Sequence, residues 1–332
     1  MKFHPLLLYS LTSYIVQNKV RNNDRYPLVL MLEPLHKCNL SCEGCGKIRE
    51  FKDTLSDMLS LKECFSAIDE SGAPIISITG GEPLIYPEID ALVSGIISRK
   101  KHIYLCTNAL LLSDFLSRNK PSPYLNINVS LDGMDTTHDA IRNRSGVFAQ
   151  AIKSIKDAKK RGYRVVINTT IYSETNVGEI VSLLTLLKSL KVNGIMLAPG
   201  FSYFDSDSDM FLTKEKTINK FKELSAHLDK IPIMNTPLYM DFLQGKRSYD
   251  CTPWGNPNRN VRGWKSPCYL ITDTHYDSFN ELMNKTPWEK YGPNNDKRCK
   301  NCMMHCGYEP TIAREAGKNF KDTMRMIKWN LF

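Results

Sequence analysis

The sequence predicts an α/β fold, built as a partial (β/α)6 TIM-like barrel with a small Cys-rich C-terminal domain. Three observations support this prediction. Six short apolar, β-branched runs alternate with segments of helical periodicity between residues 26 and 200, which is typical of a parallel sheet with right-handed crossovers. Six such units suggest a partial barrel rather than a closed eight-stranded one. After Asp250 the alternation ends and cysteines become frequent.

The predicted strands and helices follow one another in order. The apolar runs predict strands at 28–33, 75–79, 103–107, 125–131, 164–171 and 194–198. The first clear helix begins at Ser60, where Glu63 three residues later completes a capping box. Its apolar face follows the helical period and consists of Leu61, Cys64, Phe65 and Ile68. Similar faces predict further helices around residues 89–96, 148–155, 180–187 and 218–228.

The chain divides into four parts. Residues 1–25 hold an apolar helix, 26–200 the barrel, 201–250 a helical connection that opens with a polar loop at 201–209, and 251–332 an irregular, Cys-rich domain. The last residues, 320–332, read as a basic amphipathic helix. For the N-terminal helix, which basic residues follow, we favour packing on the domain. The alternative is a helix lying on a membrane surface.

Composition narrows the class of protein. The 332 residues are 42% hydrophobic and 24% charged, which excludes disordered, collagen-like and coiled-coil chains. No run reaches the roughly 18 apolar residues of a membrane span. The net charge of +9 is spread along the chain, so we expect a solvated surface with mild attraction to anionic membranes, and no nucleic-acid binding.

The chain contains ten cysteines. The apolar run at the N-terminus has no small-residue cleavage site after it, so we expect no signal peptide. We therefore expect a protein of the reducing cytoplasm, with peripheral contact to the inner face of the membrane as an alternative. Clustered cysteines in that compartment indicate metal binding or catalysis rather than disulfides.

Three cysteines lie just past the first predicted strand. Cys38, Cys42 and Cys45 fall within eight residues, and thiolates are ligands for iron–sulfur clusters or zinc. Three local ligands leave one iron of a [4Fe–4S] cluster open for a substrate or cofactor. A zinc loop or chance clustering is the alternative, but ligands of such folds bind at the carboxyl ends of the strands.

A glycine pair follows the second predicted strand. The segment Gly80, Gly81, Glu82 and Pro83 comes directly after Thr79. Two glycines allow the backbone to approach a ligand closely, and Glu82 could accept hydrogen bonds from a ligand ammonium group. Alone, this segment is only a tight turn.

Together, the CxxxCxxC and GGEP segments resemble the radical S-adenosylmethionine (SAM) superfamily. The resemblance implies a [4Fe–4S] cluster on Cys38, Cys42 and Cys45, with its open iron binding the methionine end of SAM. It also implies reductive cleavage of SAM to a 5′-deoxyadenosyl radical. The family often has an aromatic residue before the third cysteine, where this chain has Gly44, so the shielding of the cluster should differ.

The resemblance continues in the segments 130–133, 138–142 and 146–148. By position in that family, Ser130 is implied at the ribose of SAM and Asn168 at its methionine end. Ile195, next to Gly194, is implied at the adenine.

Longer segments resemble the hopanoid-biosynthesis group of radical SAM proteins, from about residue 20 to about residue 310. They are residues 26–36, 71–78, 99–112, 120–124, 251–257 and 305–308. This resemblance implies addition of the deoxyadenosyl radical to the terminal alkene of a hopene such as diploptene. The electron would come from reduced flavodoxin or ferredoxin. Another lipid, natural product or peptide is the alternative substrate, and a non-catalytic metal protein is the third interpretation.

Radical addition to the alkene leaves a tertiary carbon radical that has to be quenched. A thiol suits this task because its S–H bond is weak. Cys106 ends the third predicted strand, and we predict it as the hydrogen-atom donor. The alternative is a strand cysteine that packs like Ala or Val.

A second group of cysteines lies near the C-terminus. The arrangement Cx(11)GxxxxC, then CxxC, resembles the auxiliary-cluster domains of some radical SAM enzymes. Four thiolates would hold a second [4Fe–4S] cluster, with zinc as the alternative metal. Five cysteines compete for the four places: Cys251, Cys268, Cys299, Cys302 and Cys306.

Overall fold

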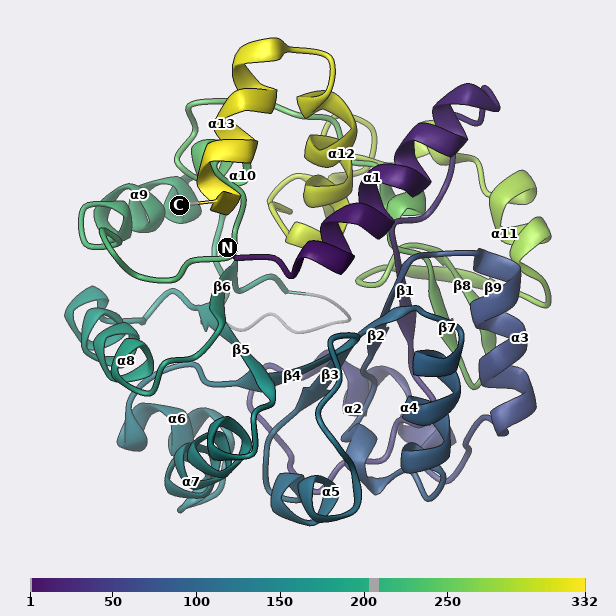
Figure 1. Ribbon diagram of the computed structural model, residues 1–332. Coiled ribbons are helices and arrows are strands. Elements are labelled where there is room, and N and C mark those ends of the chain that lie inside the picture. The colour runs from purple at the N-terminus through teal and green to yellow at the C-terminus, as the bar shows by residue number, and fades with distance from the viewer. Residues whose placement is uncertain (1, 203–208, 332) are drawn as a thin grey trace.

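The computed structural model describes residues 2–202 and 209–331. Its centre is a nine-stranded sheet with the order β6-β5-β4-β3-β2-β1-β7-β8-β9 (Figure 1). The first six strands pair in parallel, which confirms the predicted α/β partial barrel. They are β1 (Val29–Leu32), β2 (Ile75–Ile78), β3 (His102–Thr107), β4 (Leu125–Ser130), β5 (Arg164–Ile171) and β6 (Gly194–Pro199).

Helices follow these strands and cover the outer face of the sheet (Figure 1). They are α3 (Leu61–Ser71), α4 (Ile89–Ser98), α5 (Leu112–Arg118), α6 (Asp135–Ile141), α7 (Val147–Lys160) and α8 (Val177–Ser189). The predicted capping box at Ser60 is present, since the Glu63 backbone N–H donates to Ser60 Oγ and the Ser60 N–H donates to the Glu63 carboxylate. The predicted start of this helix is therefore confirmed.

The two faces of the parallel strands differ in chemistry. Side chains alternate along a strand, and one face is apolar and fully buried in the core with the helices, as at Leu30, Ile76 and Ile127. The opposite face carries small and polar side chains. They include Ser77, Cys106, Asn128, Ser130 and Asn168. This second face lines the inside of the partial barrel and offers the groups that can meet a ligand.

Beyond Asp250 the chain is more regular than we expected. β7 (Asn258–Asn260) pairs in parallel with β1, and β8 (Gly263–Pro267) and β9 (Thr272–Tyr276) continue the sheet in antiparallel fashion. The prediction of an irregular segment was therefore wrong for these residues. The sequence pattern did not predict β7 because this strand is only three residues long and buries asparagines instead of apolar side chains. One of them, Asn258, donates a hydrogen bond from Nδ2 to the Met31 carbonyl at 3.0 Å.

The remaining helices lie at the two ends of the chain and around the C-terminal cysteines. They are α1 (Pro5–Val20), α9 (Lys214–Ser225), α10 (Pro237–Leu243), α11 (Phe279–Lys285), α12 (His305–Ala316) and α13 (Phe320–Leu331). α1 packs at the amino-terminal end of the strands, where Ser10 Oγ and His102 Nε2 are 3.1 Å apart. Leu228 lies beyond α9, and most of the predicted loop at 201–209 falls outside the described residues. None of the helices in the described ranges is long and apolar enough to cross a membrane.

Candidate functional site

The loop with Cys38, Cys42 and Cys45 runs from the end of β1 to α2 (Gly46–Glu50). The glycine-pair segment lies directly against it: the Gly81 N–H donates to the Leu35 carbonyl at 3.1 Å, and the Glu82 N–H to the Lys37 carbonyl at 3.0 Å. The two motifs that we identified separately in the sequence therefore meet at the carboxyl end of β1 and β2.

Close approach of these loops requires both glycines. A Cβ on Gly81 would lie 2.0 Å from the Lys37 carbonyl oxygen, and one on Gly80 would lie 2.4 Å from that of Leu35. Gly80 also has a φ of +107°, which other residues rarely adopt. The glycine pair thus has a structural task, in addition to the expected approach of a ligand.

Glu82 is only 1% exposed. Its carboxylate accepts hydrogen bonds from Thr107 Oγ1 at 2.7 Å, from the Asn108 N–H at 2.8 Å and from the Leu84 N–H at 3.1 Å. Burial raises the pKa of Glu82 to about 7 despite these donors. Glu82 therefore ties its loop to the end of β3, and contact with a ligand ammonium group stays a prediction.

The segment after β4 supports the cysteine loop. Arg142 forms an ion pair with the buried Asp132 at 2.5 Å, and its Nη1 lies 3.6 Å from Cys42 Sγ. Asp132 also accepts a hydrogen bond from the Thr170 N–H at 2.8 Å. Asp139 accepts from the N–H groups of Gly146 and Phe148 at the start of α7. This segment thus supplies a cap for α7 and a cation that reaches the cysteine loop.

The three thiols are close enough for one to influence the pKa of another. All three are free and half-buried. Burial raises the pKa of Cys38 to about 12, and burial also raises the pKa of Cys42, which the Arg142 guanidinium opposes. In residues 2–202 and 209–331, no three His, Cys, Asp or Glu side chains stand at the spacing of ligands to one ion. A [4Fe–4S] cube spreads its ligands, because each thiolate binds a different iron.

Gly44, which stands where the family often has an aromatic residue, is covered by Met210 and Phe211. Gly44 has a φ of +72°, and a Cβ there would lie 3.1 Å from Phe211 Cζ and 2.7 Å from Met210 Sδ. Phe211 in turn packs near Tyr172, with ring centroids 6.2 Å apart. Phe211 follows β6, so the sequence around Gly44 gave no sign of this cover.

Cys106 lies on the polar face of β3, inside the partial barrel. Its Sγ is 3.5 Å from Ser77 Oγ and accepts a hydrogen bond from Asn128 Nδ2 at 3.4 Å. Cys64, by contrast, is fully buried on the apolar face of α3. The structure therefore places Cys106 among polar neighbours rather than in the apolar core.

Ser130 and Asn168 are neighbours across β4 and β5. Asn168 Oδ1 is buried and has no hydrogen-bond partner, as expected of a polar atom that a ligand satisfies. Ile195 is fully buried in the hydrophobic core. Its neighbour Met196, which pairs with Asn168, is half-buried on the inner face. Contact between a cofactor and this part of β6 would therefore use Met196 or the backbone rather than the Ile195 side chain.

The five C-terminal cysteines surround one cavity. Its empty volume is about 560 Å³, part of it open to solvent. Burial raises the pKa of every one of these thiols, and neighbouring thiols raise most of them further. The described residues of the lining include Pro253, Tyr269, Leu270, Ile271 and Tyr308, and none of them is charged. The donor set and the enclosure suit a second cluster, with one thiol more than a [4Fe–4S] cube needs.

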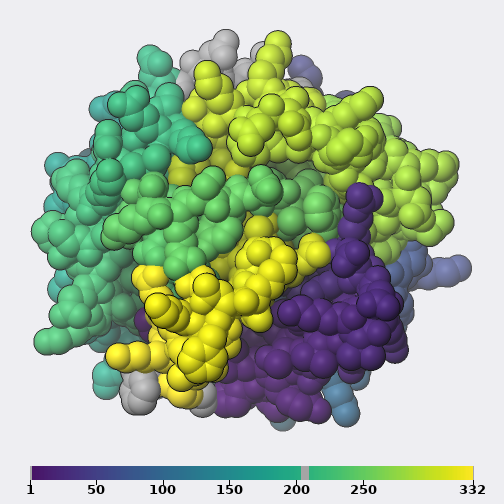
Figure 2. Space-filling view, turned by 90° about the horizontal axis from the view of Figure 1, so that it is seen from above, coloured from purple at the N-terminus to yellow at the C-terminus, as the bar shows by residue number. Residues whose placement is uncertain are grey.

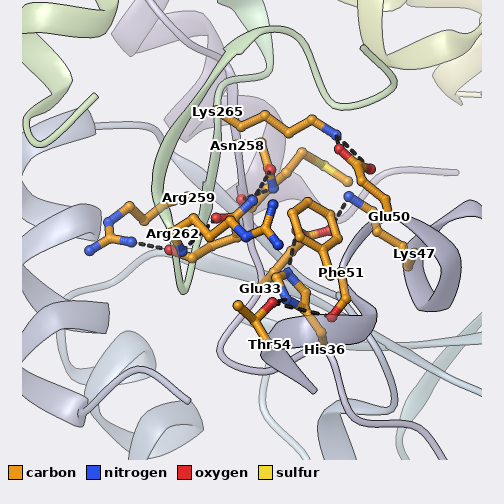
Figure 3. A network of polar contacts seen from close by, with 12 residues as sticks. Glu33, His36, Lys47, Glu50, Phe51, Thr54, Asn258, Arg259, Arg262 and Lys265 are labelled. Atoms are coloured by element: carbon orange, nitrogen blue, oxygen red, sulfur yellow. Dashed lines mark hydrogen bonds and ion pairs between the residues drawn. The ribbon is translucent and has the colours of Figure 1, made fainter. Parts of the chain in front are cut away.

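A buried charge network lies between α2 and β8 (Figure 3). Lys47, two residues after Cys45, forms an ion pair with Glu33 at 2.8 Å. Lys265, three residues before Cys268, forms one with Glu50 at 3.0 Å. All four of these side chains are less than 5% exposed. The network therefore holds α2 against β8, and with them the two cysteine-bearing loops.

The charges in this network shift one another's pKa values. Burial would raise the pKa of Glu33, but Lys47 and His36 lower it to about 2. Burial and the neighbouring Lys47 lower the pKa of Lys265 to about 8. His36 is fully buried and stacks on Phe51 at 4.0 Å. Glu33 and His36 therefore belong to the interior of the protein.

Tyr269 links the cavity to the barrel. It lines the cavity beside Cys268 and is hydrogen-bonded to Thr79. Burial raises the pKa of Tyr269, and the nearby Cys106 and Cys45 raise it further. The Lys47 ammonium lies 4.2 Å from the centre of its ring. Sequence reasoning missed Tyr269, Lys47 and Lys265, because only folding brings residues more than two hundred positions apart into contact.

Two families match the chain. Residues 32–187 match the family described as "Radical SAM superfamily", and residues 195–326 match a "Domain of unknown function (DUF3463)". The first match runs from the last residue of β1 into α8, and it includes the three cysteines after β1 and the glycine pair after β2. The second begins in β6 and includes all five C-terminal cysteines.

Similar sequences include the GTP 3′,8-cyclase of Clostridium botulinum (strain Okra / Type B1), 29% identical over 228 residues, which are 64% of this chain and 69% of that protein. The GTP 3′,8-cyclase of Campylobacter jejuni subsp. jejuni serotype O:6 is 32% identical over 169 residues, 49% of this chain and 52% of that protein. Neither is a hopanoid-biosynthesis protein, so these relatives do not support that finer resemblance.

Similar structures share the fold. Streptococcus suis SuiB bound to S-adenosylmethionine superimposes with a TM-score of 0.57 and 16% identity, covering 76% of this chain and 62% of that one. The chain thus spans less than two thirds of SuiB's length. Native anSMEcpe with bound AdoMet gives a TM-score of 0.57 with 17% identity, covering 92% of this chain and 97% of that one.

Proposed function

We propose that this chain, which contains a radical SAM domain, is a radical SAM enzyme that adds the 5′-deoxyadenosyl radical to the terminal alkene of a hopene. The cofactors of this family are a [4Fe–4S] cluster and SAM. When bound, the reduced cluster would supply one electron for the cleavage of SAM into methionine and the 5′-deoxyadenosyl radical. The product would be adenosylhopane, an intermediate in the synthesis of hopanoid side chains.

Residues of this chain would bind and orient the cofactors. Cys38, Cys42 and Cys45 would hold the cluster, and the glycine-pair loop would lie along the methionine end of SAM. The unpartnered Asn168 Oδ1 lies beside Ser130 on the inner face of the sheet. Asn168 and Ser130 would therefore hydrogen-bond polar groups of SAM inside the barrel.

The uncharged part of the cavity lining that lies beside the C-terminal cysteines, and so beside the second cluster that they would hold, carries the proposal for the substrate class. The described lining residues are cysteines, glycines, prolines, aromatic and aliphatic side chains and one amide, Asn256, without a Lys, Arg, Asp or Glu. Tyr269 connects the cavity to the region of Cys45 and Cys106. A polycyclic hydrocarbon gains free energy by leaving water for such a lining. An anionic substrate such as a nucleotide needs several cationic or amide donors instead, and Asn256 is the single amide side chain among the described lining residues.

Quenching of the product radical would fall to Cys106. Addition forms a C–C bond and leaves one unpaired electron on a tertiary carbon of the hopane. Transfer of the hydrogen atom from Cys106 Sγ would give the saturated product and a thiyl radical. One electron from reduced flavodoxin or ferredoxin and one proton would then restore the thiol. Ser77 and Asn128, which contact Cys106 Sγ, would orient it.

A second candidate is cyclisation of GTP. The identity of 29% to a GTP 3′,8-cyclase extends over 228 residues, and this observation favours it. That enzyme class would share the barrel and its cofactors with our first proposal, and would differ in the substrate.

One anaerobic assay separates the two candidates. The reconstituted and reduced protein is supplied with SAM and either diploptene or GTP, and the products are identified by mass spectrometry. We expect the mass of adenosylhopane with diploptene. A cyclised nucleotide formed from GTP would support the second candidate and contradict the hopene proposal. Formation of 5′-deoxyadenosine without either product would contradict both proposed substrates and still support cleavage of SAM by the protein.

A further inference from the structure

The exposed large apolar side chains gather on the two terminal helices. In the residues that the structure describes, nine such side chains are exposed, and eight of them lie on α1 and α13. The ninth is Met58. Single exposed apolar side chains are common on proteins, but a concentration of them marks an interaction site. The eight are Leu6, Tyr9, Val16 and Val20 on α1, and Phe320, Met324, Ile327 and Leu331 on α13.

On each helix these side chains form a row. The spacing of Phe320, Met324, Ile327 and Leu331 is i, i+4, i+7 and i+11, which is one helical face. Phe320 is 79% exposed, and Val20 on α1 is 78% exposed. Other residues of these helices, such as Leu7 and Asn330, are buried. Packing on the domain therefore uses one side of each helix and leaves the apolar row uncovered.

The two helices are neighbours in space. The Lys2 N–H donates to the Asn330 carbonyl at 3.1 Å, and the rings of Phe3 and Trp329 meet edge to face at 5.4 Å. Figure 2 shows α13, in yellow, beside the purple N-terminal part of the chain. We call the eight exposed apolar side chains of α1 and α13 the terminal-helix surface.

Positive charges accompany the apolar rows. Lys321, Arg325 and Lys328 are exposed and directly follow Phe320, Met324 and Ile327. Of these three, Arg325 forms an ion pair with Asp241. α1 has no acidic residue and ends beside the exposed Lys19 and Arg21. The single acidic residue of α13, Asp322, is paired with Arg247 at 2.7 Å. Arg247 and Arg325 balance Asp322 and Asp241, so Lys19, Arg21, Lys321 and Lys328 give this apolar surface a net positive charge.

We propose that the terminal-helix surface docks on an anionic phospholipid bilayer, with its apolar rows at the level of the headgroups. Apolar helix faces bordered by Lys and Arg bind such interfaces without crossing them. A second copy of the chain is a poorer occupant, because docking the same surface on itself would bring like charges together. The surface lies where α1 covers the amino-terminal end of β3, so docking leaves the cysteine loops at the opposite end accessible.

Vesicle sedimentation tests this proposal with the full chain. We expect binding to vesicles that contain phosphatidylglycerol, weaker binding to pure phosphatidylcholine, and loss of binding as salt screens the charges. The variant Tyr9→Ser/Val20→Ser/Phe320→Ser/Ile327→Ser should lower the affinity for anionic vesicles ~tenfold or more, because it removes most of the insertable apolar area. Met58→Ser, which removes the exposed apolar side chain elsewhere, should bind as the wild type does.

Several results would overturn the proposal. These are absence of binding to anionic vesicles, or equal binding by the quadruple variant and the wild type, with circular dichroism showing both folded. A dimer that the quadruple variant dissociates, without vesicle binding, would assign the surface to a second copy instead. None of these measurements needs catalysis, so their outcome is independent of the proposed reaction.

Discussion

At the scale of single residues, the candidate site depends on polar groups that are buried but held by specific partners. Arg142 reaches both Asp132 and Cys42, and Glu82 accepts three hydrogen bonds that join two loops. These residues act on the cysteine loop through its surroundings. We expect their removal to lower the free energy of unfolding, and to weaken cofactor binding as a consequence.

Arg142→Met should destabilise the protein strongly. The variant leaves the Asp132 carboxylate, whose side chain is 2% exposed, without its cation, and breaking a buried pair from one side costs ~3–5 kcal/mol. Urea unfolding should show the loss, with partial recovery in Asp132→Asn/Arg142→Met. The exposed pair of Arg99 and Asp69 supplies a control, since Arg99→Met should cost at most ~1 kcal/mol. Equal losses for Arg142→Met and Arg99→Met would contradict the structural role of Arg142.

Cys106→Ala should separate radical formation from radical quenching. Cleavage of SAM should continue, because Cys106 is not among the expected cofactor ligands, but the adduct should appear as unsaturated or otherwise quenched products. Liquid chromatography with mass spectrometry measures the ratio. Cys64→Ala, at a buried thiol of the apolar core, is the matched control and should keep the saturated product. A normal yield of that product from Cys106→Ala would remove Cys106 from the reaction.

At the scale of secondary-structure elements, helix α1 covers the amino-terminal end of the barrel and contacts a buried histidine of β3 there. His102, the first residue of β3, is fully buried and lies against Ser10. Burial lowers the pKa of His102 from 6.5 to about 4. The folded protein therefore keeps His102 neutral at a pH where the unfolded chain is protonated.

This shift makes stability fall on the acid side. Between pH 6.5 and about 4 the unfolded chain binds a proton that folded His102 does not, so stability rises with pH across this window and is lost as pH falls, by at most ~1.4 kcal/mol per pH unit from one group. His102→Gln should flatten this part of the dependence of Tm on pH. His227→Gln, at an exposed histidine of the connection after α9, should not. Parallel curves for wild type and His102→Gln would disprove the assignment.

At the scale of the whole molecule, one sheet carries both groups of cysteines. β7 pairs with β1 and continues into β8, and the Lys47–Glu33 and Lys265–Glu50 pairs connect the loops behind these strands. The C-terminal cysteines come from segments between residues 251 and 306 and surround one cavity. Metal binding there should therefore stabilise the C-terminal segments as a unit.

Metal analysis tests both cysteine groups. After anaerobic reconstitution we expect about eight irons per chain, or about four irons and one zinc if the C-terminal site takes zinc. Cys268→Ala/Cys302→Ala should remove the second set and leave about four irons with SAM cleavage intact. Cys38→Ala/Cys42→Ala/Cys45→Ala should remove the first set and abolish cleavage. Full iron content in Cys268→Ala/Cys302→Ala would show that the C-terminal cysteines hold no metal.

The sequence by itself determined the parallel half of the fold and the two motifs of the cysteine loop. The strand at 164–171 and the capping box at Ser60 were predicted as they stand, because periodicity and capping depend on residues close together in the chain. The tertiary structure alone decided the strands β7 to β9, the cover of Gly44 by Phe211, and the positions of Tyr269, Lys47 and Lys265. These features join segments far apart in sequence. The local sequence around one residue of each contact does not predict which distant residue it will meet. Burial also decided that Glu33, His36 and Ile195 face the interior, since a residue's type does not state which side of a strand or loop meets solvent.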